Sequence, residues 1–175
     1  YGVTLYNCLV TLKHNVSKAW SNIDVLLKQR HDELPKLVEV CKQYIGYEKD
    51  TLERVISARS AVFAAREAGD IGKLGAAETL LRGGLGNLFA LAESYPELKA
   101  DQNFQHLQQR ITGLENTIAD RREYYNESVN LNNVRLEQFP DVIIARGVGF
   151  NARDLLEFSE EEKQDVDMKT LFTER

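Results

Sequence analysis

The residues of this chain that could do chemistry are polar side chains that interrupt otherwise apolar helical stripes. Apolar side chains recur every three or four residues, which is the spacing of one face of a helix. Polar residues occupy the same spacing at Arg30, Glu48, Arg59, Arg121 and Asn132. Near Trp20, Asn22 and Asp24 flank Ile23. The candidate site residues are Asp24, Arg30, Glu48, Arg121 and Asn132.

Two interpretations fit polar side chains at such positions. Long charged side chains can pair with one another inside a helical assembly and fix the register of its helices. Alternatively, the same groups line a polar groove that binds a partner or a ligand. Because a single buried charge is costly, we expect these groups to be paired rather than isolated.

The sequence lacks the common patterns of metal, phosphate and nucleophile sites. Its three histidines lie far apart, and no H-x-x-x-H, H-E-x-x-H, E-x-x-H or C-x-x-C spacing occurs. Gly83-Gly84-x-Gly86 lies within an apolar helical pattern and follows no strand, so it does not indicate a phosphate loop. Cys8 and Cys41 fit neither a disulfide framework nor a metal site. We therefore expect no cofactor, no metal and no catalytic residue.

The composition is that of an ordinary globular chain. Of its 175 residues, 43% are apolar and 28% are charged, and the formal net charge is −5. Residues 157–167 contain six acids and one Lys, so this short stretch accounts for the whole net charge. Because no basic face stands out elsewhere, we do not expect binding to nucleic acid.

The start of the chain suggests a missing upstream segment. No run of about 18 apolar residues occurs, so the chain as given does not span a bilayer. It begins at Tyr1 without a Met, and the helical pattern is already present by Val3. We therefore expect further residues before Tyr1 in the natural protein.

The apolar spacing predicts a first helix over about 3–30 and a second over about 35–68. Pro35 lies between the two stripes, and a proline inside a helix lacks an N–H group and clashes with the carbonyl four residues earlier. An uninterrupted helix over 3–68 would be about 100 Å long, which is out of scale for a domain of this size. We therefore expect the chain to reverse direction at His31–Leu34.

Two more helices are expected, over about 71–93 and about 101–139. The first of these is rich in glycine, so it should be the least stable helix and should approach its neighbours closely. The fold class is all-α, an up-and-down antiparallel four-helix bundle of long helices over residues 1–140. Residues 141–175 should form an irregular, acidic C-terminal extension, with a short helix at Ala152–Phe158.

Several motifs in the chain match a known family. The most specific is W-S-N-I-D-V-L-L-K-Q-R-H-D-E-L-P-K-L-V at Trp20–Val38, preceded by Y-N-x-L-V at Tyr6–Val10. Shorter motifs follow, namely Y-P-E-L-K-A-x-x-N-F at 95–104, L-E-N-x-I-A at 114–119, Y-N-x-x-V at 125–129, F-P at 139–140 and G-F at 149–150. Over roughly residues 5–158, these motifs resemble the LemA family of bacterial membrane-associated proteins.

The resemblance implies one N-terminal membrane helix just before Tyr6-Asn7, followed by an antiparallel helical bundle. It implies no catalytic residues, because none is established for the family. It also links the fold to magnetosome proteins and to genes that lie beside those of membrane proteases. The chain departs from many members in its Gly-rich helix over 71–93 and in its long acidic tail.

Two functional hypotheses follow. The first is a noncatalytic scaffold or adaptor, tethered to a bacterial membrane by an N-terminal helix absent from this chain, that binds other membrane or envelope proteins. A homo-oligomer is a further option under this hypothesis. The second is a small-ligand receptor or an enzyme, with a polar pocket between helices that contains Asp24, Arg30, Glu48 and Arg121.

Overall fold

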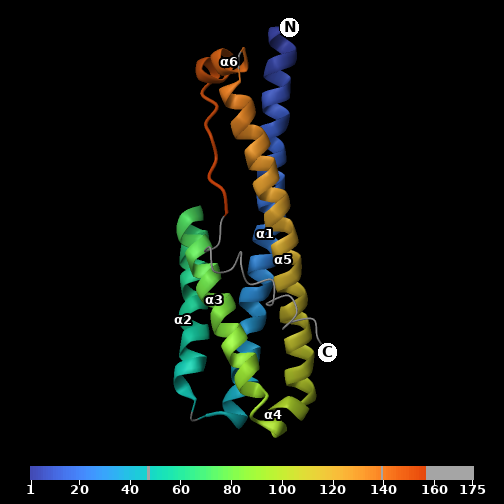
Figure 1. Cartoon of the computed structure of the whole chain (residues 1–175), viewed down its shortest axis with the longest axis vertical. Coiled ribbons are helices and arrows are strands. Elements are labelled where there is room, and N and C mark those ends of the chain that lie inside the picture. Colours follow the sequence, from blue (N-terminus) through green and yellow to red (C-terminus); the bar gives the residue numbers. More distant parts are fainter. Residues whose placement is uncertain (47, 139, 157–175) are drawn as a thin grey trace.

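The described part of the chain is helical throughout its regular structure, as the sequence predicts. The computed structural model describes residues 1–46, 48–138 and 140–156. Within these ranges there is no strand. The helices, labelled in Figure 1, are α1 (Gly2–Tyr44), α2 (Lys49–Ala68), α3 (Ile71–Ala92), α4 (Pro96–Ala100), α5 (Gln102–Glu137) and α6 (Asp141–Val148).

Helix α1 continues through Pro35, so the expected reversal at 31–34 and the expected helices over 3–30 and 35–68 are wrong. It contains 43 residues, which corresponds to about 64 Å. Pro35 cannot supply the backbone N–H that would normally donate to the carbonyl of His31. Arg59 of α2 replaces this donor, because its Nε donates to the His31 carbonyl oxygen at 2.9 Å. A side chain from a neighbouring helix therefore satisfies the carbonyl that the proline leaves open.

The chain instead reverses beyond Tyr44. Buried Ile45 ends α1 by donating its backbone N–H to Cys41, and Glu48 precedes the first turn of α2. Gly69 then ends α2 in the left-handed conformation, at φ 67°. Asp70 caps α3 through Lys73 N, and Asp101 caps α5 through Phe104 N, each at 3.0 Å. Helices α3 and α5 lie within two residues of the ranges expected from the sequence.

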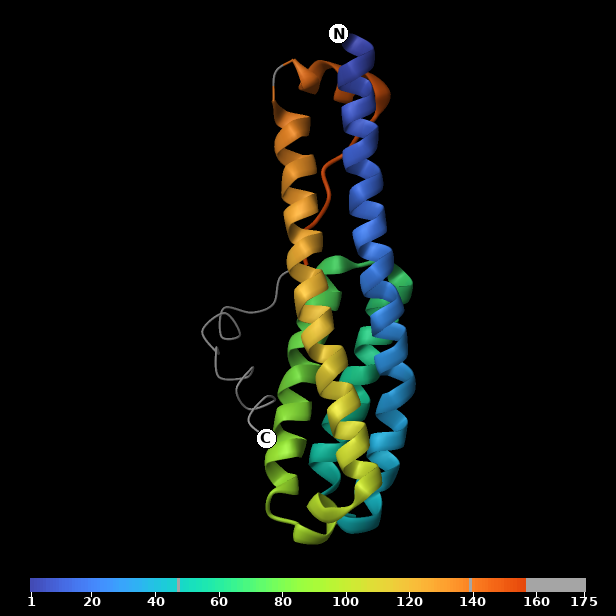
Figure 2. The ribbon, with the colours of Figure 1, turned by 90° about the vertical axis from the view of Figure 1, so that its right-hand side faces the viewer.

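The molecule is a rod with two different halves (Figures 1 and 2). In the lower half, α1, α2, α3 and α5 lie side by side around one apolar core. In the upper half, α1 and α5 continue alone as a pair, with α6 across their end. A small second cluster joins Leu9, Leu136 and Ala145 there. The lower half therefore encloses a core between four helices, whereas the upper half is mainly a pair of helices.

Glycine allows one close approach between helices in the lower half. A Cβ added at Gly84 of α3 would lie 3.4 Å from Val55 Cγ2 on α2 and close to the Val55 backbone. The same addition at Gly83 would meet no atom within 4 Å. A Cβ at position 84 would therefore touch Val55, whereas one at position 83 would meet open space.

The chain after Pro140 is more ordered than the expected irregular extension. Asp141–Val148 forms helix α6, and Gly149 ends it at φ 78°. Residues 151–156 are not helical, so the expected short helix is wrong for 152–156. This segment runs back along the upper half from α6 (Figures 1 and 2). The acidic residues 157–175 lie outside the described residues.

Within the described ranges, no helix combines the length and the apolar character needed to cross a membrane.

Candidate functional site

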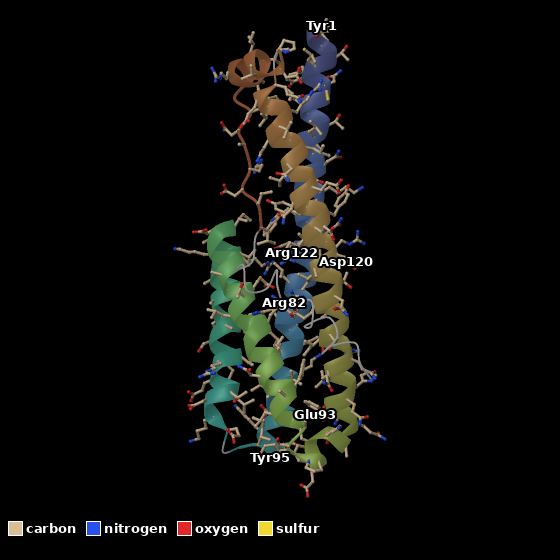
Figure 3. The ribbon with its side chains drawn as sticks, in the orientation of Figure 1. Tyr1, Arg82, Glu93, Tyr95, Asp120 and Arg122 are labelled. Atoms are coloured by element: carbon tan, nitrogen blue, oxygen red, sulfur yellow. The ribbon has the colours of Figure 1, made fainter. Side chains whose placement is uncertain are left out.

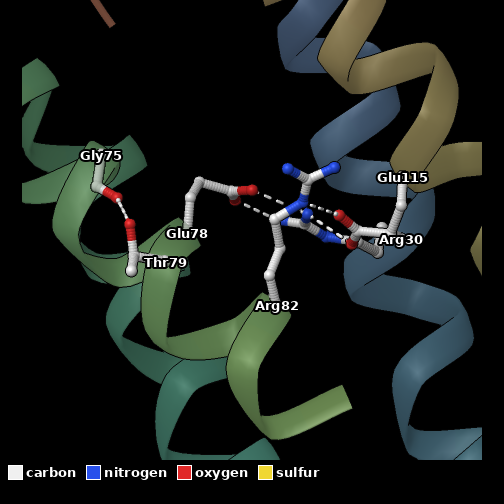
Figure 4. Close-up of polar contacts among 6 residues, drawn as sticks. All are labelled: Arg30, Gly75, Glu78, Thr79, Arg82 and Glu115. Atoms are coloured by element: carbon white, nitrogen blue, oxygen red, sulfur yellow. Dashed lines mark hydrogen bonds and ion pairs between the residues drawn. The ribbon is translucent and has the colours of Figure 1, made fainter. Parts of the chain in front are cut away.

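Four charged side chains meet inside the lower half, and we call them the ionic cluster (Figure 4). Arg30 of α1 donates to Glu78 of α3 and to Glu115 of α5, with Nη1–Oε distances of 2.8 and 2.7 Å. A further bond joins Arg30 Nη2 to the other Glu78 oxygen. Arg82 completes the cluster, with its Nε 3.3 Å from Glu115 Oε2. The cluster therefore ties three helices together at one level.

The ionic cluster is deeply buried and balanced in charge. Arg30, Glu78 and Glu115 are each 1% exposed. Burial alone lowers the pKa of Arg30, but the attraction of Glu115 and then Glu78 outweighs it, so the pKa lies above its ordinary value. A guanidinium that stays protonated cannot exchange a proton with a substrate. The arrangement is that of a structural network, because each charge already has an opposite partner.

Asp24 and Glu48 lie in two other places. Asp24 accepts two bonds from Arg66 of α2, with an Nη2–Oδ2 distance of 3.2 Å for the longer one. Glu48 lies at the lower end, where Tyr95 donates its hydroxyl over 3.5 Å. Figure 3 shows Tyr95 at this end and Arg82 further up the lower half. Both acids are only partly buried.

Arg121 and Asn132 are separated from all of these groups and from each other. Arg121 is exposed on α5, although its spacing had suggested an inward position. Asn132 lies three turns further along α5, is 3% exposed, and faces a cavity in the upper half. The structure therefore does not bring the five candidate residues together.

The cavity has a volume of about 280 Å³. Helix α1 supplies Lys13 and Val16, α5 supplies Asn132, and residues 149–153 form the remaining wall. The ammonium of Lys13 lies 5.6 Å from the centre of the Phe150 ring, within the range of a cation–π interaction. Two cations, the amides of Asn132 and Asn151, and the apolar side chains of Val16, Phe150 and Ala152 therefore border one concave site.

An asparagine clamp holds the wall formed by the C-terminal segment. Asn133 of α5 donates to the Arg153 carbonyl and accepts from its N–H, and Asn126 does the same with Leu156. All four bonds are 2.8 Å long. The seven-residue step from Asn126 to Asn133 along the helix and the three-residue step from Arg153 to Leu156 along the extended segment both span about 10 Å. The two asparagines therefore match the spacing of their two backbone partners. Between them, Tyr125 donates its hydroxyl to the Asp154 carbonyl at 3.2 Å.

Sequence reasoning found one member of the ionic cluster, Arg30, and missed the other three. On α3, the step from Leu74 to Leu81 skips position 78, where the helical spacing requires an inward residue. On α5, Leu114 was assigned to the buried stripe, but Glu115 is 1% exposed and Leu114 is only partly buried. The signal in the sequence for these partners was an acidic residue, Glu78 or Glu115, at a position that helical spacing directs inward.

The described residues contain no group of three or more His, Cys, Asp or Glu side chains that could hold a metal ion. Both cysteines are free thiols. Burial raises the pKa of the Cys41 thiol to about 12, so Cys41 remains protonated near neutral pH and is a poor nucleophile. These observations assign no reaction to the described part of the chain.

Comparison with known proteins identifies the family. The magnetosome protein MamQ of Magnetospirillum gryphiswaldense is 27% identical over 168 residues, which cover 83% of this chain and 62% of that protein. MamQ 1 and MamQ 2 of Paramagnetospirillum magneticum match with the same identity and coverage. The chain thus spans less than two thirds of these relatives. The LemA family model matches residues 19–170, and the chain belongs to the LemA family.

Proposed function

We propose that this protein is a noncatalytic, membrane-tethered helical scaffold or adaptor that binds other cell-envelope proteins. Its family membership supports this proposal, as do relatives that are named for a cellular structure, the magnetosome, and not for a reaction. An N-terminal membrane helix before Tyr1 would supply the tether. The lower half would act as an antiparallel four-helix bundle that holds the upper half away from the membrane or against a partner.

The observation that carries the proposal is that the buried charges are paired with one another, whereas several apolar side chains of α5 are exposed to solvent. Arg30, Glu78 and Glu115 contact one another in the interior. On the upper half of α5, by contrast, Tyr124, Leu131 and Val134 are 50%, 58% and 54% exposed. Their spacing of seven and three residues places them on one face of the helix. We call these three residues the outer face of α5.

The outer face of α5 suits contact with another protein. Single exposed apolar residues are normal, but several on one helix face can form a binding surface. Among the described residues, α1, α6 and the clamped segment are the parts that lie against α5 in the upper half, and the outer face carries its exposed apolar side chains. Apolar contacts on such a face are typical of helix recognition by a partner groove or helix.

The second hypothesis, a polar pocket containing Asp24, Arg30, Glu48 and Arg121, has less support. Arg30 is enclosed in the ionic cluster, Asp24 is paired with Arg66, and Arg121 is exposed elsewhere. Catalysis requires such groups to converge on one substrate position. The favoured function is therefore one of binding between proteins.

Site-specific photo-crosslinking in the native bacterium tests the proposal. A photoreactive amino acid would replace Leu131 in the natural full-length protein, with Gln109, an exposed residue on the lower half of α5, as the control position. We expect discrete crosslinked products from position 131 that are absent from position 109. Identical products from both positions, or none from position 131, would contradict the proposal.

A further inference from the structure

The buried amide of Asn132 has no hydrogen-bond partner among the described residues. Its side chain is 3% exposed, and it borders the cavity between α1, α5 and residues 149–153. Its amide faces this cavity and is not sealed from it, so the amide can bond to water or to a ligand that enters the cavity. The neighbouring Asn133 differs, because its side chain makes two hydrogen bonds to the backbone of Arg153.

Two cations flank this amide across the cavity. Lys13 comes from α1 and Arg153 from the segment that the asparagine clamp holds. Both residues are exposed to solvent. The backbone of Arg153 is fixed by two bonds of 2.8 Å to Asn133, and the ammonium of Lys13 lies 5.6 Å from the centre of the Phe150 ring. No acid is among the described residues that border the cavity, so neither cation is neutralised from within it.

We propose that this cavity binds a small organic oxyanion, a carboxylate or phosphate head with a short apolar body. Lys13 and Arg153 would attract the head, and the Asn132 amide would donate to one of its oxygens. Charge-assisted bonds of this kind are among the stronger hydrogen bonds in proteins. Val16 and Phe150 offer the apolar contact for the body.

The size and the composition of the cavity decide the class of ligand. A volume of about 280 Å³ is just below the usual range of sites for drug-sized molecules, which begins at about 300 Å³. The cavity is larger than an inorganic ion needs and smaller than a whole nucleotide needs. The polar groups are all donors or amides, so a cation or a purely apolar ligand would leave them without partners. An anion with one apolar end uses both cations, the Asn132 amide and the apolar side chains of Val16 and Phe150.

Titration of the ¹⁵N-labelled chain with four soluble probes tests this inference. Phenyl phosphate and benzoate carry an anionic head and an apolar body, inorganic phosphate lacks the body, and benzamide lacks the charge. We expect the two aromatic anions to shift the Asn132 side-chain amide resonances saturably and to bind more tightly than inorganic phosphate. Benzamide should not shift them. If no anion shifts these resonances saturably, the inference is overturned.

Matched variants separate the cavity from general charge effects. Asn132→Leu removes the amide at similar size, so its affinity is read from the backbone amides of Phe150 and Arg153, which border the cavity in both chains. The variant should lose the saturable shift of these amides with phenyl phosphate without a lower melting temperature. Lys13→Gln and Arg153→Gln should each weaken binding by about tenfold. Lys18→Gln and Arg146→Gln remove the same charge from exposed positions that do not border the cavity, and should leave binding unchanged. Equal affinity in Asn132→Leu and the original chain would also overturn the inference.

Vesicles distinguish a lipid headgroup from a soluble compound as the source of the oxyanion. Co-sedimentation with phosphatidylglycerol vesicles would be compared between the original chain and Asn132→Leu, with phosphatidylcholine vesicles as the neutral control. Binding that Asn132→Leu loses, together with a positive probe titration, would assign the oxyanion to a lipid. Binding that is absent or unchanged in the variant, with a positive titration, would assign it to a soluble compound.

Discussion

Arg59 Nε donates a 2.9 Å hydrogen bond to the backbone carbonyl of His31, the group that Pro35 leaves without its helical donor. This relationship explains how α1 passes through a proline without reversing. It also gives Arg59 a structural role at a position where an apolar residue would fit the stripe. One residue on α2 thereby satisfies a backbone carbonyl of a different helix.

A double-mutant cycle on Arg59 and Pro35 should show that the two positions are coupled. Arg59→Met should lower the free energy of unfolding by about 1–3 kcal/mol, because it leaves the His31 carbonyl unsatisfied. In a Pro35→Ala background, the new alanine supplies the missing backbone N–H, so the same change should cost clearly less. Urea unfolding of the four proteins measures the coupling. Equal effects of Arg59→Met in both backgrounds would show that the carbonyl bond is not the reason for the arginine.

The ionic cluster should behave as a unit. Glu115→Leu removes one of the two carboxylates that neutralise the buried Arg30, and we expect it to destabilise the fold by about 3–5 kcal/mol. Arg30→Met, Glu78→Leu and Glu115→Leu together remove the buried charges, and Arg82, which is 15% exposed, can turn toward solvent. The combined variant should therefore be more stable than Glu115→Leu alone. Denaturant titrations would reveal the opposite order if each pair contributed separately.

The sequence predicted the all-helical class, and the ranges of α3 and α5, because apolar spacing and capping residues are local signals. The path of α1 could not be predicted, because the donor that compensates Pro35 comes from Arg59, far along the chain. Arg30 was recognised as an anomaly, but its partners Glu78 and Glu115 lie on helices whose relative register only packing determines. The clamp that holds residues 153–156 depends on tertiary geometry alone.

Stability should depend on pH through His31. Burial lowers the pKa of this imidazole, and the positive charge of Arg59 lowers it further, below the ordinary value of 6.5. The unfolded chain therefore binds a proton more readily, so the contribution of His31 is complete above about pH 6.5 and is lost as the pH falls toward the folded-state pKa. Arg59→Met should raise the His31 pKa in an NMR titration. Arg54→Met, an exposed arginine on the same helix, should leave the titration of His31 unchanged. Equal pKa values in Arg59→Met and the original chain would remove Arg59 as a cause.

The asparagine clamp should control the order of residues 153–156. Asn126→Ala removes both bonds to Leu156, and Asn133→Ala removes both bonds to Arg153. Two neutral hydrogen bonds contribute about 1–3 kcal/mol, so each change should accelerate amide exchange at its own backbone partner most strongly. Hydrogen-exchange NMR resolves the two amides. Asn130→Ala, an exposed asparagine on the same helix, is the control, and equal acceleration by all three changes would exclude a specific clamp.

The central claim is that the buried charges of the ionic cluster serve only the interior of the bundle, whereas the outer face of α5 binds the partner. Photo-crosslinking from position 131 in the native bacterium tests it most directly when two variants are compared. The combined change at Arg30, Glu78 and Glu115 should leave the crosslinked products as they are in the original protein. Tyr124→Lys with Val134→Lys, a purely surface change, should abolish them. The claim is contradicted if the charge-free interior variant remains folded but loses the products, while the surface variant retains them.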